Sequence, residues 1–212
     1  MAEDVAPRSP DYSHERLCPA PVCGIDEVGR GPWAGPVVAA AVILDPEAIP
    51  DGLDDSKRVP GPRREELAAQ LHSVALVGVG VASVAEIEAM NILQASFLAM
   101  RRAVAGLAQR PALALVDGHL QPPGLPCPCR PIVGGDGLAL SIAAASIVAK
   151  VARDRMMVAL AQQFPGYGWE TNMGYGTKAH ADGLARLGIS PHHRRSWRPI
   201  HNILYEGADV TD

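Results

Sequence analysis

The chain has 212 residues, of which 48% are apolar and 20% are charged, and its formal net charge is −4. This composition is ordinary for a globular domain with a sizeable core, and no stretch approaches the roughly 20 apolar residues that a membrane-spanning helix needs. The four cysteines are too few for a disulfide framework at this length, and the chain opens without a signal-peptide pattern, so we expect a cytoplasmic protein that does not bind membranes.

Runs of apolar residues and their spacing predict the elements of the chain. Residues 1–20 are rich in proline, serine and charge, and are predicted to be a mobile N-terminal extension. In chain order we then predict strands at 22–25 and 37–44, a helix at 63–72, a strand at 74–81, a helix at 92–108 capped by Asn91, strands at 112–116 and 132–133, and helices at 138–162 and 177–187. Strands that alternate with helices predict one layered α/β domain over 21–205, followed by a short tail at 206–212.

An acidic pair stands beside a glycine-rich turn near the start of this domain. Asp26 and Glu27 end the first predicted strand, and Gly-Arg-Gly follows at 29–31. Carboxylates beside a buried strand need a partner, which could be a metal ion or simply Arg30. The pair alone therefore leaves two interpretations open, a metal site or an acidic strand end that is paired with arginine.

Two later aspartates also follow predicted strands. Asp117 comes directly after the strand at 112–116, and Asp136 comes after the strand at 132–133. Each alone is a common turn signal, but loops at strand ends are where α/β domains build their sites. Three apolar segments that each end in carboxylate favour a site for a hard cation such as Mg²⁺ or Mn²⁺.

Basic residues are concentrated in the last third of the chain. Between residues 150 and 202 there are eight lysines and arginines against three acidic residues. This uneven distribution predicts a surface that attracts nucleic acid despite the negative net charge.

Seven short motifs, in order, resemble the ribonuclease HII family between about residues 22 and 203. They are Asp-Glu-x-Gly-Arg-Gly at 26–31, Asp-Ser-Lys at 55–57, Asp-Gly at 117–118, Gly-Asp at 135–136, Ala-Ala-Ser-Ile-Val-Ala-Lys at 144–150, Gly-Tyr-Gly-Thr at 174–177 and His-Arg-Arg-Ser-Trp at 193–197. The chain departs from the family at Gly134, where lysine is common, and at Met173, where the segment is often more polar.

The resemblance implies a ribonuclease H-like three-layer α/β fold, with a mixed five-stranded sheet flanked by helices and a helical C-terminal part. It also implies a two-metal site for Mg²⁺ or Mn²⁺, whose catalytic ligands are Asp26, Glu27, Asp117 and Asp136. The substrate-binding residues it implies are Gly29, Arg30 and Gly31 around the ribonucleotide, Tyr175 against the sugar, Lys57, Thr177, Arg194 and Arg195 at phosphates, and Ser146 and Lys150 behind the site. Asp154, four residues after Lys150, is predicted to pair along the helix and not to bind metal.

The implied activity is that of a metal-dependent endoribonuclease, with no protein nucleophile. Its substrates would be RNA–DNA hybrids and duplex DNA with embedded ribonucleotides, cut on the 5′ side of a single ribonucleotide to leave 5′-phosphate and 3′-hydroxyl ends. We expect a monomer. The alternatives are another nuclease of the same fold, resolvase or transposase-like, and a non-cleaving hybrid-binding protein, since fold alone does not fix function.

Overall fold

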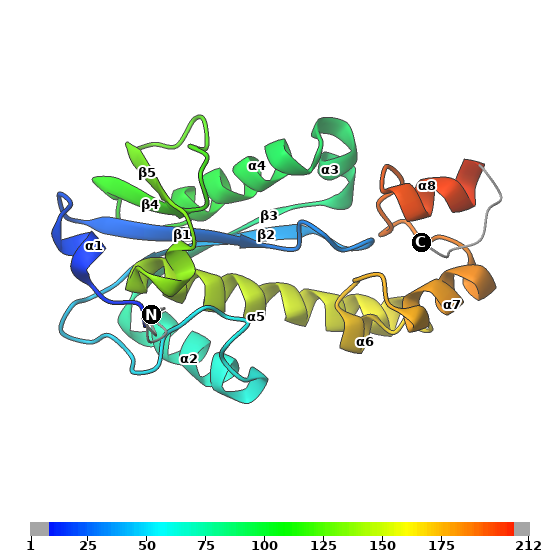
Figure 1. The fold of residues 1–212 in the computed structure, drawn as a ribbon, viewed down its shortest axis with the longest axis horizontal. Coiled ribbons are helices and arrows are strands. Elements are labelled where there is room, and N and C mark those ends of the chain that lie inside the picture. The colour runs from blue at the N-terminus through cyan, green and yellow to red at the C-terminus, as the bar shows by residue number, and fades with distance from the viewer. Residues whose placement is uncertain (1–8, 206–212) are drawn as a thin grey trace, which may run out of the picture.

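The computed structural model describes residues 9–205, and its centre is a five-stranded mixed sheet (Figure 1). The strand order is β3-β2-β1-β4-β5. The strands are β1 Val22–Val28, β2 Val37–Ile43, β3 Leu76–Ala82, β4 Leu113–Asp117 and β5 Cys129–Ile132. β2 is antiparallel to both β1 and β3, whereas β4 is parallel to both β1 and β5. The predicted mixed sheet of five strands is confirmed.

The side chains of β2 show how helices come to cover both faces of the sheet. Val37, Ala39 and Ala41 are buried in one cluster with α4 (Ile92–Ala105), whereas Ala40 and Val42 are buried in another with α2 (Gly61–Val74) and α5 (Leu140–Gln163). Because successive residues of a strand point to opposite faces, a continuous apolar strand needs cover on both sides. Figure 1 shows the resulting three layers, with α4 on one side of the sheet and α2 and α5 on the other.

The long helix α5 lies unusually close to the central strand. A Cβ added at Gly24 would fall 2.1 Å from the backbone carbon of Ser141, so only glycine lets α5 approach β1 this closely. The first three turns of α5 are almost entirely buried, and this explains their run of alanines. The start of α5 is therefore packed directly against the backbone of β1, close to Asp26.

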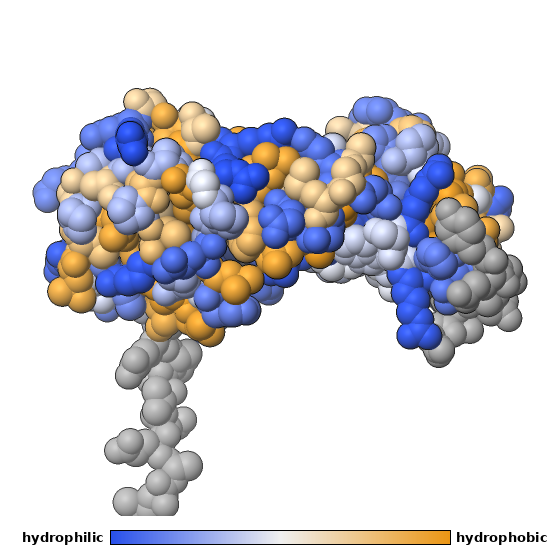
Figure 2. All heavy atoms as spheres, turned by 90° about the horizontal axis from the view of Figure 1, so that it is seen from above, coloured by the Kyte–Doolittle hydropathy of each residue, from blue (hydrophilic) through white to orange (hydrophobic). Residues whose placement is uncertain are grey.

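Beyond the sheet, α5 continues into a small helical C-terminal part (Figure 1). Its helices are α6 Trp169–Asn172, α7 Lys178–Leu187 and α8 Arg198–Tyr205. They pack around Ala34, Met157, Trp169, Leu184 and Ile200, so this part has its own apolar cluster. Figure 2 shows it as one end of an elongated molecule.

The N-terminal segment differs from the prediction. Residues 1–8 lie outside the described residues, but residues 9–20 are packed on the domain, with a short helix α1 at Ser13–Arg16. The buried carboxylate of Glu15 accepts hydrogen bonds from the backbone N–H of Ser141 at 2.8 Å and from its Oγ at 2.6 Å. This acid sits at the start of α5, where a helix has free N–H groups and favours negative charge. The prediction of a mobile segment over 1–20 is therefore wrong for residues 9–20.

Most predicted elements are confirmed to within a few residues, including the cap of α4, where Asn91 Oδ1 accepts from Leu93 N–H and Gln94 N–H. Besides α1, three short helices of the described residues were not predicted: α3 (Val84–Met90), α6 and α8. The predicted tail at 206–212 lies outside the described residues. No helix among residues 9–205 combines the length and the apolarity that crossing a membrane requires.

Candidate active site

The parallel pairing of β1 with β4 brings two of the predicted acids to neighbouring strand ends. The last paired residues are Ile25 and Val116, so Asp26 and Asp117 come next on adjacent strands. The third strand end contributes Asp136, which lies in a short 3₁₀ turn at Gly135–Gly137 just after β5. The backbone N–H of Gly135 donates to Asp117 Oδ1 at 2.8 Å and so ties this turn to the end of β4.

Asp26 and Glu27 point to opposite sides of the sheet, as their adjacent positions on a strand require. Asp26 is buried, with only 8% of its surface exposed, on the face where Gly24 meets α5. Glu27 lines a small cavity of about 90 Å³ on the α4 side, together with Phe97 and Met100. The two carboxylates therefore lie on different faces of the sheet and do not point at one common position within it.

The four acids repel one another. Burial raises the pKa of Asp26 well above its usual range, and Glu27, Asp117 and Asp136 each add to the rise. Burial also raises the pKa of Glu27, against the opposing effect of Arg30. The pKa of Asp136 is raised by burial and by Asp117. Three segments thus place negative charge in one region, where a bound cation would relieve the repulsion.

The donor set fits a hard divalent cation, because all four side chains offer only carboxylate oxygens. Within residues 9–205, no three His, Cys, Asp or Glu side chains are already gathered closely enough to hold one ion. Two of the acids have other partners: Glu27 Oε1 pairs with Arg30 at 3.3 Å, and Asp117 accepts from Gly135. The acids have the right chemistry for a metal site, and the pair between Arg30 and Glu27 engages only one of the two Glu27 oxygens.

A polar loop brings a cation to the edge of the acidic region. Lys57 is 83% exposed at its side chain, and its pKa is affected first by burial, which lowers it, and then by Asp55, Asp136 and Asp26, which together raise it. The loop is held from below by α5, where Ser146 Oγ donates to Ser56 Oγ at 2.8 Å. Lys57 is thus an exposed positive charge near the acids. A residue that contacts a phosphate of the substrate needs both of these properties.

The Gly-Arg-Gly turn lies next to Tyr175. A Cβ on Gly31 would be 3.8 Å from Tyr175 Cε1, and the tyrosine is 44% exposed. Gly29 has a φ of +94°, and a Cβ there would fall 2.1 Å from Nε of Arg153. Glycine is therefore required at residue 29, both by its backbone conformation and by this buried arginine. The turn and the tyrosine together form one exposed corner at the end of β1.

Arg194 was predicted to contact phosphate, and the structure contradicts this. Arg194 is fully buried and donates to the backbone carbonyls of Gly29, Arg30 and Gly35. A guanidinium that is enclosed in the protein and donates to backbone carbonyls there does not reach a phosphate at the surface. Arg195 is exposed, and its role as a phosphate contact stays a prediction.

The other predicted substrate contacts have defined structural partners. Ser146 is 3% exposed and supports the loop of Lys57, so it does not face a ligand. Lys150 is paired with Asp154 at 2.7 Å, and this confirms the predicted pair along the helix. Thr177 caps α7 by accepting from His180 N–H, but it is exposed and could still meet a phosphate.

Sequence reasoning missed the structural role of Arg153. It is fully buried and donates to the carbonyls of Ala34, Pro36 and Met173. Arg153 thereby joins the segment after the Gly-Arg-Gly turn to the loop before Tyr175. The sequence shows only an arginine in a basic segment, without a signal that it is buried. Because Arg153 and Arg194 are buried, two of the eight basic residues between 150 and 202 do not contribute to the surface.

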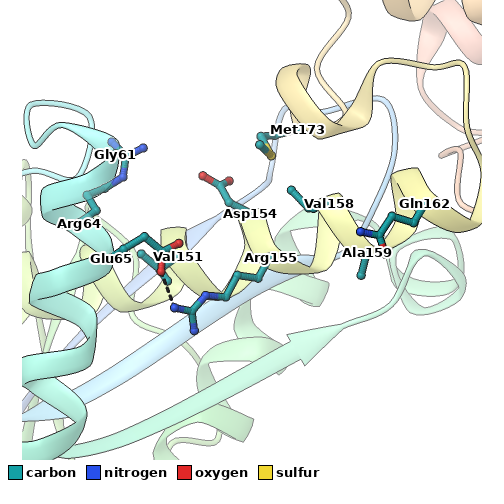
Figure 3. A pocket seen from close by; sticks show the side chains of 10 residues that line it. All are labelled: Gly61, Arg64, Glu65, Val151, Asp154, Arg155, Val158, Ala159, Gln162 and Met173. Carbon is teal, nitrogen blue, oxygen red and sulfur yellow. Dashed lines mark hydrogen bonds and ion pairs between the residues drawn. The ribbon is translucent and has the colours of Figure 1, made fainter.

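A larger hollow of about 390 Å³ lies elsewhere, between α2, α5 and the start of the Tyr175 loop. Figure 3 shows the ion pair between Arg155 and Glu65 across its wall. Its other charged residues are also engaged, Asp154 with Lys150 and Arg64 with the carbonyls of Ser56 and Val59. The hollow therefore lacks unpaired charge, and Met173, where the chain departs from the family, lines it.

The chain is similar to known proteins over nearly its whole length. The family model described as Ribonuclease HII matches residues 23–200. Ribonuclease HII of Cereibacter sphaeroides (strain KD131) is 62% identical over 95% of this chain and 97% of that protein. Ribonuclease HII of Ruegeria pomeroyi is 58% identical over 93% of this chain and 86% of that protein.

Solved structures agree with these relatives. The crystal structure of ribonuclease H2 from Pyrococcus horikoshii superposes with a TM-score of 0.72 at 27% identity, covering 86% of this chain and 96% of that one. Ribonuclease HII from Archaeoglobus fulgidus, solved in a complex with PCNA, gives a TM-score of 0.70 at 27% identity, covering 84% and 95%. The sheet and the helical C-terminal part are therefore shared with these structures.

Proposed function

The chain belongs to the ribonuclease HII family and is a ribonuclease H enzyme, and from this we propose that it is a metal-dependent endonuclease that cuts the RNA strand of RNA–DNA hybrids. We include in this proposal the cleavage of single ribonucleotides in duplex DNA on their 5′ side, leaving 5′-phosphate and 3′-hydroxyl ends. The observation that carries the proposal is the convergence of Asp26, Glu27, Asp117 and Asp136 beside the exposed corner of Gly31 and Tyr175.

The four carboxylates are the residues that would hold Mg²⁺ or Mn²⁺. When bound, such ions supply positive charge to the reacting phosphate and lower the pKa of a water that attacks it. The protein's own contribution is to hold the acids at three adjacent strand ends, Asp26 on β1, Asp117 on β4 and Asp136 after β5. The backbone N–H of Gly135 orients one oxygen of Asp117 and leaves the other available.

Selection of RNA over DNA rests on the 2′-hydroxyl, the one group that distinguishes a ribonucleotide from its DNA counterpart in sugar chemistry. The exposed corner offers backbone groups of the Gly-Arg-Gly turn and the aromatic ring of Tyr175 within contact of each other. A sugar placed there would lie beside Glu27, whose partner Arg30 belongs to the same turn. Lys57, Arg195 and Thr177 are exposed and are proposed to contact flanking phosphates.

The deciding experiment incubates the purified protein with a duplex that contains one ribonucleotide, with EDTA, with Mg²⁺ and with Mn²⁺. We expect cleavage only with a divalent cation, and mapping of the ends should place the cut on the 5′ side of the ribonucleotide. An otherwise identical all-DNA duplex is the control and should stay intact. Tight binding without cleavage would favour a hybrid-binding protein, and cleavage of DNA junctions alone would favour a resolvase.

A further inference from the structure

The closing segment His193–Trp197 binds the carbonyl oxygens of the Gly-Arg-Gly turn one after another. Arg194 donates to the carbonyls of Gly29 and Arg30, the latter at 2.8 Å. Trp197 takes the next carbonyl, since its Nε1 donates to Gly31 O at 3.3 Å. All three carbonyls of the turn are thus held by a segment more than 160 residues away in the sequence.

This segment is itself firmly placed. The guanidinium carbon of Arg194 lies 4.8 Å from the ring centre of Trp197, a cation–π distance. Arg194 N–H donates to Trp33 O at 2.8 Å, and Gly35 N–H donates to His192 O at 2.9 Å. On its outer side, both carboxylate oxygens of Glu88 on α3 accept from Ser196 N–H. The segment therefore connects the turn, and Trp33 just after it, to α3.

The geometry of the peptide bond shows what these contacts achieve. In a planar trans peptide the carbonyl of one residue and the N–H of the next point in opposite directions. Holding the carbonyls of Gly29 and Arg30 toward Arg194 therefore directs the N–H groups of Arg30 and Gly31 away from it. Tyr175 Cε1 lies only 3.8 Å from the Cβ position of Gly31, so these amides belong to the exposed corner.

We infer that Arg194 and Trp197 are positioning residues for ribonucleotide recognition: they orient the Gly-Arg-Gly backbone so that its amides meet the ribose, without touching the substrate. This inference rests on the proposed function, because it concerns how the same site distinguishes RNA from DNA. Arg194 is suited to this task because its charge is enclosed and its planar fork binds several carbonyls at once. A lysine there would keep the charge but lose the fork.

The test measures recognition apart from cleavage. In an Asp136→Asn background, which is expected to leave the duplex uncut, the Kd of an all-DNA duplex is divided by the Kd of the same duplex with one ribonucleotide. Trp197→Phe keeps an aromatic ring beside Arg194 and loses the Nε1 donor together with the rest of the indole, so this ratio should fall about threefold to tenfold, the effect of one hydrogen bond. Arg194→Lys should reduce it by about tenfold or more. Arg186→Lys is the matched control, since Arg186 also donates to a loop carbonyl, that of Gly166, far from the turn.

The outcomes separate the inference from the proposed function. If the Asp136→Asn protein binds both duplexes equally and the wild type cuts neither, the proposed function fails. Suppose instead that the Asp136→Asn protein prefers the duplex with the ribonucleotide. If adding Trp197→Phe leaves this preference unchanged, and circular dichroism shows that the variant is folded, only the inference is overturned. Trp197→Phe decides the matter even if Arg194→Lys does not fold. A fall in affinity for both duplexes by the same factor would also contradict the inference. Correct positioning of the Gly-Arg-Gly backbone should favour the ribonucleotide and so change the ratio of the two Kd values.

Discussion

His180 Nδ1 lies 2.9 Å from the backbone carbonyl of Tyr175, so a buried histidine supports the loop that carries the exposed tyrosine. The carbonyl can only accept, which places the proton of His180 on Nδ1. His193 Nδ1 accepts from Ser190 N–H at 2.9 Å, so His193 carries its proton on Nε2 and donates to His180 Nε2 at 3.0 Å. This network assigns the neutral form to both histidines.

Acid should therefore destabilise the C-terminal part of the fold. Burial lowers the pKa of His180, and burial together with His180 lowers the pKa of His193 to about 3. Between that value and the unfolded pKa of about 6.5, the unfolded state binds more protons, so stability is full above pH 6.5 and falls as the pH drops. Each pH unit in this window costs up to about 1.4 kcal/mol for His193.

The measurement is the melting temperature between pH 7.5 and pH 4.5. His193→Asn should melt lower than the wild type at pH 7.5 but lose less on acidification, so the difference between the two should shrink at pH 4.5. His72→Gln, at an exposed position on α2, is the control and should follow the wild type throughout. A difference that stays constant with pH would show that His193 is not held neutral.

Removing one acid should abolish turnover and stabilise the protein without metal. Burial and three like charges raise the pKa of Asp26, so the fold loses stability as the pH rises above the unfolded pKa of this group. Asp26→Asn should therefore melt higher than the wild type in EDTA at pH 7.5, while kcat falls by orders of magnitude. Asp182→Asn, whose acid is paired with Lys178 on the surface, should change neither quantity appreciably.

The same loss of turnover is expected for Glu27→Gln, Asp117→Asn and Asp136→Asn, because each substitution removes one ligand charge. Activity should be measured across a Mg²⁺ titration. Wild-type rates for Asp117→Asn at limiting Mg²⁺ would remove β4 from the proposed site.

Tyr175 should matter most where an RNA–DNA junction is recognised. Tyr175→Phe keeps the stacking face, whereas Tyr175→Ala loses a contact worth roughly 1–3 kcal/mol. We expect Tyr175→Ala to slow cleavage at a single ribonucleotide about tenfold to a hundredfold and to slow cleavage within long hybrids less. Rates on the two substrates should be compared side by side, and equal losses would assign Tyr175 to general positioning of the strand.

Arg195 should contribute to the salt dependence of binding. It is exposed, so Arg195→Gln should reduce the slope of log affinity against log salt by about one unit if it neutralises one phosphate. Arg186→Gln, another exposed arginine of the C-terminal part, serves as the control for nonspecific charge. An unchanged slope for Arg195→Gln would place its side chain away from the duplex.

The local sequence determined much of this protein. An apolar run predicted β2 well because a strand buried on both faces must be apolar throughout. β5 was predicted only at its end, at Ile132, because its sequence Cys-Arg-Pro-Ile is not an apolar run. The acids could be predicted for a similar reason, since Asp117 directly follows such a run and Asp136 comes three residues after another, Ile132-Val133. The motif at residues 26–31 indicated the family, which the relatives confirm.

Only the tertiary structure decided which polar residues are exposed near the acids and which are buried and support the fold. Arg194 and Arg195 are neighbours of one type, yet the first is buried against carbonyls of residues 29–35 and the second is exposed. Glu15 likewise stood in a segment of polar composition and is buried at the start of α5. A buried charge is stable only where distant backbone supplies its hydrogen bonds, and those partners meet it only when the chain has folded.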